Sequence, residues 1–474
     1  MSWPMRAWVF GMSVWAGTAR APVVRAQSPT TVGPRVISDF AVPVVHATTL
    51  QNGVRVLAVE NHSLPIVSVR VMLGVDSLDD PTGKEGLSEL MTSTMADATD
   101  KVPEQELSDS EAMLGTHISP TRFTTTTNNF RAAILLLGQI IERPSFPEDG
   151  VARAKSAIAQ RVQSQYAATA PVRVFFSILL APGNPARRTA TPASVDALTR
   201  ADVVSFYKTA IRPSRTTVII VGDVMPTQAF AFAKSAFGKW IVTSAMETRP
   251  SEFPVNAATP TTIYLVDVPG RLRTSILVGQ LGPQRDTAVM PAVDVLADIL
   301  GQVGGSRLQV ELRDRRGFMY AGIPYGVDWR PTPQRSIQAG SASVDAVKVD
   351  SALIAWLGAL RDVRGPSPVT AKELDFAEGV AVASLPTRFE TTDSVASQVA
   401  EAVRYGGELR DLEQYVRAVR GLSPEKVTRA AERYIDPGHL TIVVAGDRKT
   451  LEPLLRRADI APIVIVDENG NPKP

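Results

Sequence analysis

Two segments of the chain repeat one order of apolar and polar positions. In Ala197–Val224 and in Gly421–Arg448, an amphipathic stretch ends at a proline turn and a run rich in β-branched residues follows. A stripe of period 3.6 predicts a helix, and a continuous apolar run bounded by turns predicts a buried strand. We therefore expect each segment to form a helix that leads into a buried strand ending in Gly-Asp.

The two segments also keep one register. A constant offset of 224 positions aligns Gly222 with Gly446, and it places Thr199 and Ser423 together at the expected helix N-caps. Two ordinary helix–strand units that look alike by chance are the alternative. The preserved register favours a duplicated chain.

Shorter apolar runs suggest further counterparts. Ile66–Gly74 is typical of a strand and Ser275–Gly282 of its equivalent, each followed by a polar loop and an apolar-periodic helix. Val54–Glu60 and Ile66–Gly74 together predict a hairpin. We expect an α+β protein of two homologous halves, each a mixed, mainly antiparallel sheet with helices packed on one face.

The first residues have the pattern of a secretory signal. Arg6 supplies positive charge, Ala7–Gly17 is apolar, and Val24-Arg25-Ala26 fits a cleavage site. Residues 1–26 are therefore expected to be a signal peptide. An uncleaved anchor is the alternative, but about 20 apolar residues are needed to span a bilayer.

The remaining chain divides at a stretch rich in Ser, Thr, Ala and Pro. We expect a first domain over 27–242, a linker over 243–261 and a second domain over 262–474. No later stretch is long and apolar enough for a membrane span. An exported chain without cysteine suits the periplasm, with full secretion as the alternative.

Composition removes several kinds of chemistry. The chain of 474 residues has no cysteine, which excludes disulfides, thiolate metal sites and a cysteine nucleophile. A formal net charge of +2 gives no field that favours nucleic acid. The four histidines are His46, His62, His117 and His439. No two of them stand three to five positions apart, so a helix with two histidine zinc ligands cannot be formed.

The helix expected at Gly86–Met95 carries a polar face. Glu89, Thr92 and Ser93 stand at i, i+3 and i+4, the spacing at which one helix supplies two metal ligands and a base. Here the groups are one carboxylate and two hydroxyls, and neutral hydroxyls are poor zinc ligands. A solvated helix face is the alternative. Just before this helix, Asp79-Asp80 predicts a solvated turn.

A second candidate lies in the other half. Arg313 offers five fixed donors and Tyr320, seven positions later, offers a phenolic donor. Together they can hold a peptide carbonyl and stabilise the oxyanion that forms on it. The alternative is that Arg313 forms a surface ion pair with Glu311 or Asp314 and that Tyr320 only begins a strand.

Several motifs occur together in order along nearly the whole mature chain. They are L-x-N-G-V-R-V at Leu50–Val56, the Gly86-Leu87 helix start, D-V-V-S-F-Y with V-G-D-V, and the glycine-rich L-G-x-x-G-G-S-R-L that precedes Arg313. In these motifs the sequence resembles the insulinase/pitrilysin family of zinc peptidases, in the branch similar to mitochondrial processing peptidase. The resemblance implies the fold given above.

The same resemblance denies this chain a zinc site. The family's H-x-x-E-H motif aligns its histidines with Glu89 and Ser93 and its glutamate with Thr92. A further glutamate ligand comes from a later helix, here Arg153–Gln165, at the position of Gln160. All four positions are substituted, so no metal or other cofactor is expected on this chain.

Arg313 and Tyr320 match an arginine and a tyrosine that face the zinc across a chamber in the family. The resemblance thus implies a non-catalytic subunit of a periplasmic metallopeptidase, paired as a heterodimer with a homologous subunit that bears H-x-x-E-H and zinc. The two would enclose an extended peptide, which the expected edge strand Thr121–Thr127 also contacts. A catalytically silent structural or peptide-binding scaffold is the alternative.

Overall fold

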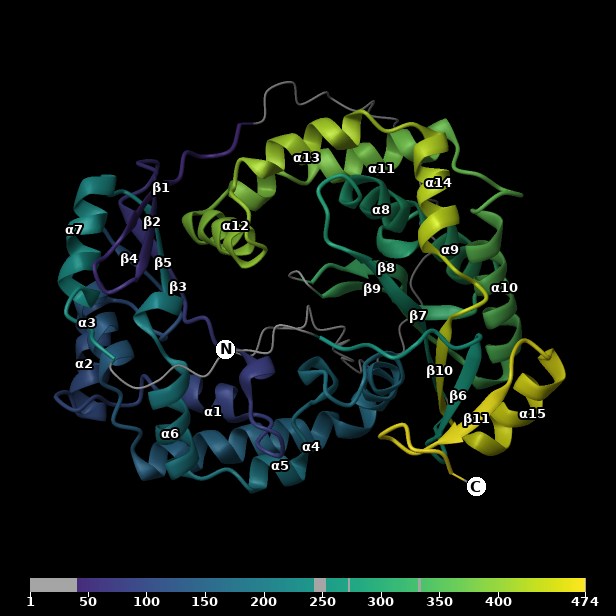
Figure 1. The fold of residues 1–474 in the computed structure, drawn as a ribbon, viewed down its shortest axis with the longest axis horizontal. Helices are drawn as coiled ribbons and strands as arrows, with labels where there is room; N and C mark the ends of the chain where they lie inside the picture. The colour runs from purple at the N-terminus through teal and green to yellow at the C-terminus, as the bar shows by residue number, and fades with distance from the viewer. Residues whose placement is uncertain (1–40, 243–252, 272, 331–333, 474) are drawn as a thin grey trace, which may run out of the picture.

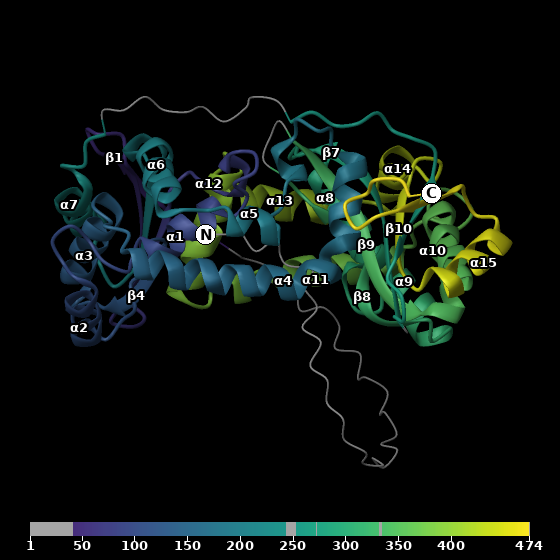
Figure 2. The same ribbon diagram turned by 90° about the horizontal axis from the view of Figure 1, so that it is seen from below.

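The computed structural model describes residues 41–242, 253–271, 273–330 and 334–473. The expected signal peptide and residues 243–252 of the expected linker lie outside this part of the chain. Two β-sheets with their helices form the two sides of the molecule (Figure 1). The same two halves are seen from below in Figure 2.

The first half is built on a five-stranded sheet of order β1-β2-β5-β3-β4. Its strands are β1 (His46–Thr49), β2 (Arg55–Glu60), β3 (Ile66–Met72), β4 (Arg122–Thr126) and β5 (Thr217–Gly222). Its helices and short 3₁₀ turns are η1 (Ser77–Asp79), α1 (Leu87–Thr94), α2 (Glu104–Leu114), α3 (Phe130–Glu142), α4 (Glu148–Leu179), η2 (Pro185–Arg187), α5 (Pro192–Asp196), α6 (Arg200–Ala210), η3 (Pro213–Arg215) and α7 (Pro226–Phe237).

The second half is built on a six-stranded sheet of order β11-β6-β10-β7-β9-β8. Its strands are β6 (Thr262–Asp267), β7 (Arg273–Gln284), β8 (Met319–Asp328), β9 (Arg335–Asp345), β10 (Thr441–Gly446) and β11 (Ile463–Val466). Its helical segments are α8 (Met290–Ala297), the π-turn η4 (Asp298–Gln302), α9 (Arg307–Gln309), the π-turn η5 (Val310–Arg315), η6 (Ala346–Lys348), α10 (Val349–Asp362), α11 (Ala371–Ala383), η7 (Pro386–Phe389), α12 (Thr392–Arg404), α13 (Asp411–Arg420), α14 (Pro424–Tyr434) and α15 (Arg448–Ala458).

The expected fold class is confirmed. In both sheets antiparallel pairs outnumber parallel ones, and the strand order β2-β5-β3-β4 is repeated as β6-β10-β7-β9. The bounds of α6 and β5, moved by 224 positions, are those of α14 and β10. Both helices begin at the expected caps, because the hydroxyls of Thr199 and Ser423 accept the N3 backbone N–H groups.

The expected hairpin is wrong. Strands β2 and β3 do not pair, because β5 lies between them, parallel to β2 and antiparallel to β3. Every residue of β5 is buried, so this strand gains most by pairing on both sides. Gly222 ends β5 at φ +144°, and a Cβ there would lie 2.1 Å from the carbonyl oxygen of Ile66. Only glycine allows this close approach.

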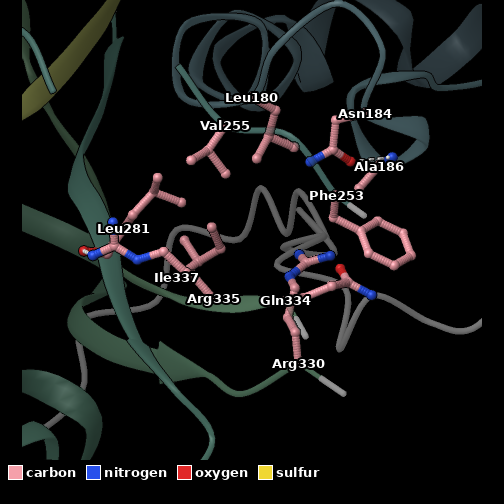
Figure 3. Close-up of a pocket in the computed structure, with 10 residues that line it drawn as sticks. All are labelled: Leu180, Asn184, Ala186, Phe253, Val255, Leu281, Arg330, Gln334, Arg335 and Ile337. Carbon is pink, nitrogen blue, oxygen red and sulfur yellow. Dashed lines mark hydrogen bonds between the residues drawn. The ribbon is translucent and has the colours of Figure 1, made fainter. Parts of the chain in front are cut away.

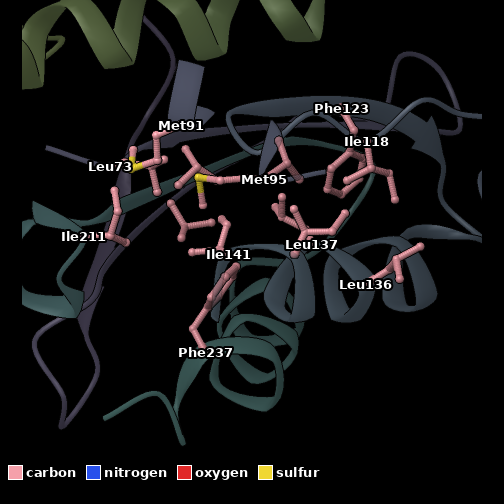
Figure 4. Packing of buried hydrophobic residues seen from close by; sticks show 14 of the residues in the cluster. Leu73, Met91, Met95, Ile118, Phe123, Leu136, Leu137, Ile141, Ile211 and Phe237 are labelled. Carbon is pink, nitrogen blue, oxygen red and sulfur yellow. The ribbon is translucent and has the colours of Figure 1, made fainter. Parts of the chain in front are cut away.

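The main core of the first half lies between its sheet and its own helices. Figure 4 shows Met91 of α1 and Met95, which directly follows α1, beside Leu137 and Ile141 of α3, with Phe237 of α7 closing the layer. These five side chains are fully buried. The second half has an equivalent core between its sheet and helices such as α8, α10 and α14.

The opposite face of each sheet is covered by a helix from the other half. The last turns of α4 pack on β10, β7 and β6 of the second sheet, and α12 packs on β3 and β5 of the first. Figures 1 and 2 show α4 running from the first half into the second. We call residues 170–179 of α4 and the whole of α12 the exchanged helices.

Each exchanged helix forms a small apolar core of its own. In α4 the centre is Phe175, which is 1% exposed, and in α12 it is Val395 and Val399, which are 1% and 2% exposed. Polar contacts fix α12 further, since the hydroxyls of Ser68 and Thr392 lie 2.7 Å apart. Because both faces of each sheet are covered, neither half completes its burial without the other.

No helix in the described residues is long and apolar enough to cross a membrane.

Candidate functional site

Helix α1 begins at a buried carboxylate. The side chain of Asp80 is 2% exposed and accepts the backbone N–H of Gly86 at 2.8 Å and of Ser88 at 2.7 Å. These bonds satisfy donors at the helix start that have no partner within the helix. The expectation of a solvated turn at this aspartate is therefore wrong. Burial raises the pKa of Asp80 to about 6, although both N–H bonds oppose the shift.

Two of the four positions aligned with zinc ligands turn back onto their own helix. The hydroxyl of Thr92 donates to the carbonyl of Ser88 at 2.8 Å, and the hydroxyl of Ser93 donates to the carbonyl of Leu90 at 3.0 Å. Thr92 is 7% exposed. Both hydroxyl protons are thus donated to the backbone of their own helix.

The third position, Glu89, already has a cationic partner. Both of its carboxylate oxygens accept from one guanidinium nitrogen of Arg161, at 2.6 and 2.7 Å. Arg161 lies on α4 next to Gln160, the fourth aligned position, whose side chain is exposed. An arginine therefore links α1 to α4 at Glu89, one of the positions that the resemblance aligns with a zinc ligand.

This set of donors does not fit zinc. Zinc sites use imidazole, thiolate and carboxylate ligands, whereas the four positions hold one paired carboxylate, two hydroxyls and an amide. Within the described ranges, no group of three His, Asp or Glu side chains is arranged to hold a metal ion. No step that passes through a metal can be derived for this chain.

The second candidate pair is exposed. Arg313 lies in the π-turn η5, and its Nε donates to Asp314 at 2.8 Å, the surface ion pair considered above as the alternative. Tyr320 is the second residue of β8 and is 49% exposed, and its hydroxyl donates to Asp345 at 2.8 Å. The guanidinium of Arg273 lies 4.0 Å from the centre of the Tyr320 ring.

The two candidate sites lie in different halves. Helix α1 packs against α4, α6 and η1, whereas η5 and β8 pack against elements of the second half such as α9, α10 and β9. Both views place α1 and α9 on opposite sides of the molecule (Figures 1 and 2). The structure therefore does not bring Arg313 and Tyr320 to the polar face of this chain's own α1.

The expected edge strand is confirmed, because β4 ends the first sheet. Its outward carbonyl groups have partners within the chain. Thr116 donates its hydroxyl to the carbonyl of Thr124 at 2.7 Å, and Asn129 donates its N–H to the carbonyl of Thr126 at 3.0 Å. These bonds leave fewer acceptors for an added strand than a bare edge would offer.

One histidine makes a long-range contact that the sequence did not indicate. His62 lies between two carboxylates, with Nδ1 2.5 Å from Asp223 and Nε2 2.6 Å from Glu60. The ring is exposed, and the two carboxylates raise its pKa. His117 is exposed to solvent and bonds Glu111.

A small enclosed cavity lies where the end of α4 meets the second sheet (Figure 3). Leu180, Val255 and Ile337 form its apolar side, and Arg330 and Gln334 its polar side. Its volume of about 10 Å³ is close to the space of one water molecule. It is therefore too small for a substrate.

Parts of this chain match a protein-family model and the sequences of known proteins. Residues 197–377 match the model of the peptidase M16 inactive domain. An uncharacterised zinc protease of Mycobacterium leprae is 24% identical over 273 residues, which cover 56% of this chain and 59% of that protein. An uncharacterised zinc protease of Mycobacterium tuberculosis is 24% identical over 270 residues.

Solved structures share the fold. A peptidase M16 inactive domain from Pseudomonas fluorescens has a TM-score of 0.72 at 22% identity, covering 85% of this chain and 98% of its own. A protease from Helicobacter pylori has a TM-score of 0.76 at 19% identity, covering 86% and 100%. These likenesses together support an insulinase-family, zinc-peptidase-like protein.

The periplasmic protease PqqL from Escherichia coli also has a similar fold. The TM-score is 0.71 at 15% identity, and the match covers 91% of this chain but 49% of PqqL. A structure of the first half of PqqL alone has a TM-score of 0.66. An insulinase-family fold of this size thus corresponds to about half of that larger protease.

Proposed function

We propose that this chain is the non-catalytic subunit of an exported insulinase-type metallopeptidase, paired with a separate zinc-bearing subunit. The observation that carries the proposal is the ion pair between Arg161 and Glu89, a position that the resemblance aligns with a zinc ligand. Among the four aligned positions the single carboxylate is paired with a guanidinium, so these positions would offer no metal that activates water. Hydrolysis would then depend on zinc, the activated water and the glutamate base of the partner.

The exposure of the second candidate pair supports a role in trans. Arg313 and Tyr320 lie in the other half from this chain's own α1 and are exposed, so a zinc site on another chain could approach them. In the complex, the guanidinium and the phenol would donate to the carbonyl oxygen of the scissile peptide bond. Such donors act by stabilising the negative charge that develops on this oxygen.

The match to half of PqqL supports the same division. This chain corresponds in fold to about half of a larger periplasmic protease, so two such chains would have the size of that whole protease. The partner would be a homologous subunit with intact H-x-x-E-H, and the substrate an extended peptide held between the two. The periplasm is the location that the N-terminal pattern and this likeness favour.

The test is peptide cleavage by the chain alone and with a homologous partner encoded beside it. Arg313→Ala should leave the complex assembled but lower kcat by about 100-fold, the usual cost of one oxyanion donor. Arg315→Ala is the matched control, because Arg315 is on the same turn with an exposed ion pair to Glu311. Strong zinc-dependent cleavage by the lone chain would refute the proposal.

The second candidate function is a silent scaffold of the same fold. It is favoured by the local bonds of Arg313 to Asp314 and of Tyr320 to Asp345, which give both side chains a structural role. Under this reading Arg313→Ala and Arg315→Ala have equal and negligible effects on the partner's activity. Native mass spectrometry of each variant separates lost assembly from lost turnover.

A further inference from the structure

Helix α12 is held by both halves of the molecule. Its first turns contact the first sheet, where Arg70 and Asp393 form an ion pair at 2.9 Å. At its other end the hydroxyl of Tyr405 donates to the carbonyl of Trp329, which follows β8 of the second half, at 2.9 Å. A displacement of the Trp329 segment would therefore also move α12 on the first sheet.

One carboxylate joins this attachment to the body of the second half. Asp294 on α8 accepts the indole N–H of Trp329 at 2.5 Å and the hydroxyl of Tyr415, on α13, at 3.0 Å. Asp294 thus bonds both to α13 and to the residue that anchors α12. The guanidinium of Arg285 lies 4.4 Å from the centre of the Tyr405 ring and completes the cluster.

A second carboxylate lies one helical turn away. Asp298 begins the π-turn η4, four positions after Asp294, so the two side chains share one helix face. Asp298 is 7% exposed, and among the described residues its carboxylate makes no hydrogen bond or ion pair. A buried carboxylate with no donor is stable only while it keeps its proton.

The other elements around α8 supply little compensating charge. Arg388 of η7 and Arg285 are the cations whose charge reaches the pair, and Tyr415 of α13 faces it. The side chains that α11 and α14 bury are apolar apart from Thr428. Around Tyr405 the charged groups are Arg285, Arg404, Asp328 and Glu401. Two negative charges on Asp294 and Asp298 would therefore repel each other in a poorly compensated site.

We propose that Asp294 and Asp298 form a proton-linked latch that sets how firmly α12 bridges the two halves. With one proton on the pair, Asp294 keeps its bonds to Trp329 and Tyr415, and α12 stays seated. When the second proton is lost, repulsion between the carboxylates shifts α8 against α13 and the Trp329 segment. The seat of α12 on the first sheet is then weakened.

Asp294 and Asp298 lose their protons close to neutral pH. Burial raises the pKa of Asp294 to about 6 and that of Asp298 to about 7, and the charge of Asp294 adds to the second shift. Both values exceed those of the unfolded chain, so the native state binds more protons between about pH 4 and 7. The stabilisation from this cluster is therefore present at low pH and is lost as pH rises through 7.

The experiment is hydrogen exchange by mass spectrometry on the full mature chain, at pH 5.5 and 8.0, with intrinsic rates corrected. In the unmodified chain we expect the protection of residues 392–404 to fall about tenfold at pH 8.0, the equivalent of one pKa unit of coupling. Asp298→Asn should abolish this fall. Asp97→Asn is the matched control, because burial also raises the pKa of Asp97 to about 6 in the other half.

A further variant keeps the test decisive if Asp298→Asn folds poorly. Tyr415→Phe removes only the hydroxyl that joins α13 to Asp294, and it should lower the protection of 392–404 already at pH 5.5. A pH-independent protection in the unmodified chain overturns the proposal, and so does a pH response that survives in Asp298→Asn.

Discussion

The exchanged part of α4 gives the sharpest prediction about stability. Phe175→Ala removes the ring at the centre of the apolar core that α4 forms with the second sheet. Phe175 is 1% exposed, and a Cβ on Gly279 would lie 2.8 Å from its Cζ, so the ring packs directly against the backbone of β7. Rigid backbone on one side limits collapse into the space that the substitution creates.

The expected cost follows from this geometry. Buried Phe→Ala substitutions usually lower the free energy of unfolding by about 3–5 kcal/mol, and we expect the upper part of that range. The loss falls on the contact between the halves, so the halves should begin to unfold separately. Phe237→Ala is the matched control, since Phe237 is equally buried but lies within the first half alone.

The assay is guanidinium unfolding, followed by tryptophan fluorescence and by circular dichroism. For Phe175→Ala the two signals should separate, because uncoupled halves no longer unfold in one step. For Phe237→Ala we expect a large loss of stability with coincident signals, because the contact between the halves is intact. A cost below about 1 kcal/mol for Phe175→Ala, with coincident signals, would show that α4 is not a required cover of the second sheet.

Three further outcomes are expected. Glu89→Gln should lower the free energy of unfolding, measured by thermal unfolding, by less than about 1 kcal/mol, because the ion pair with Arg161 is partly exposed and such pairs contribute little. The metal content of the same sample should not change. Gly222→Ala should prevent soluble expression, because its Cβ would collide with the carbonyl of Ile66; a folded variant of normal stability would contradict this. Asp80→Asn should reduce the decline of Tm as pH rises from about 4 to 6, since the raised pKa of Asp80 makes its contribution greatest at low pH; an unchanged pH profile would argue against that shift.

Much of the candidate site could be predicted from local sequence. The spacing of Glu89, Thr92 and Ser93 on one helix face, and the chemistry of hydroxyls, were enough to argue against zinc. The partner of Glu89 was not predictable, because Arg161 is 72 positions away and carries no local signal. The same holds for His62 and Asp223, which are brought together only by the pairing of β2 with β5.

The sequence by itself determined the α+β class, the duplicated halves and the helix–strand units α6–β5 and α14–β10, because periodicity and capping act over a few residues. Only the tertiary structure decided that β5 separates β2 from β3, that Asp80 is buried, and that α4 and α12 each cover the sheet of the other half. The reason is physical: an apolar pattern states that a face must be buried, but it does not state against which surface. That choice depends on which distant elements fit together, and here the best cover for each half came from its duplicate.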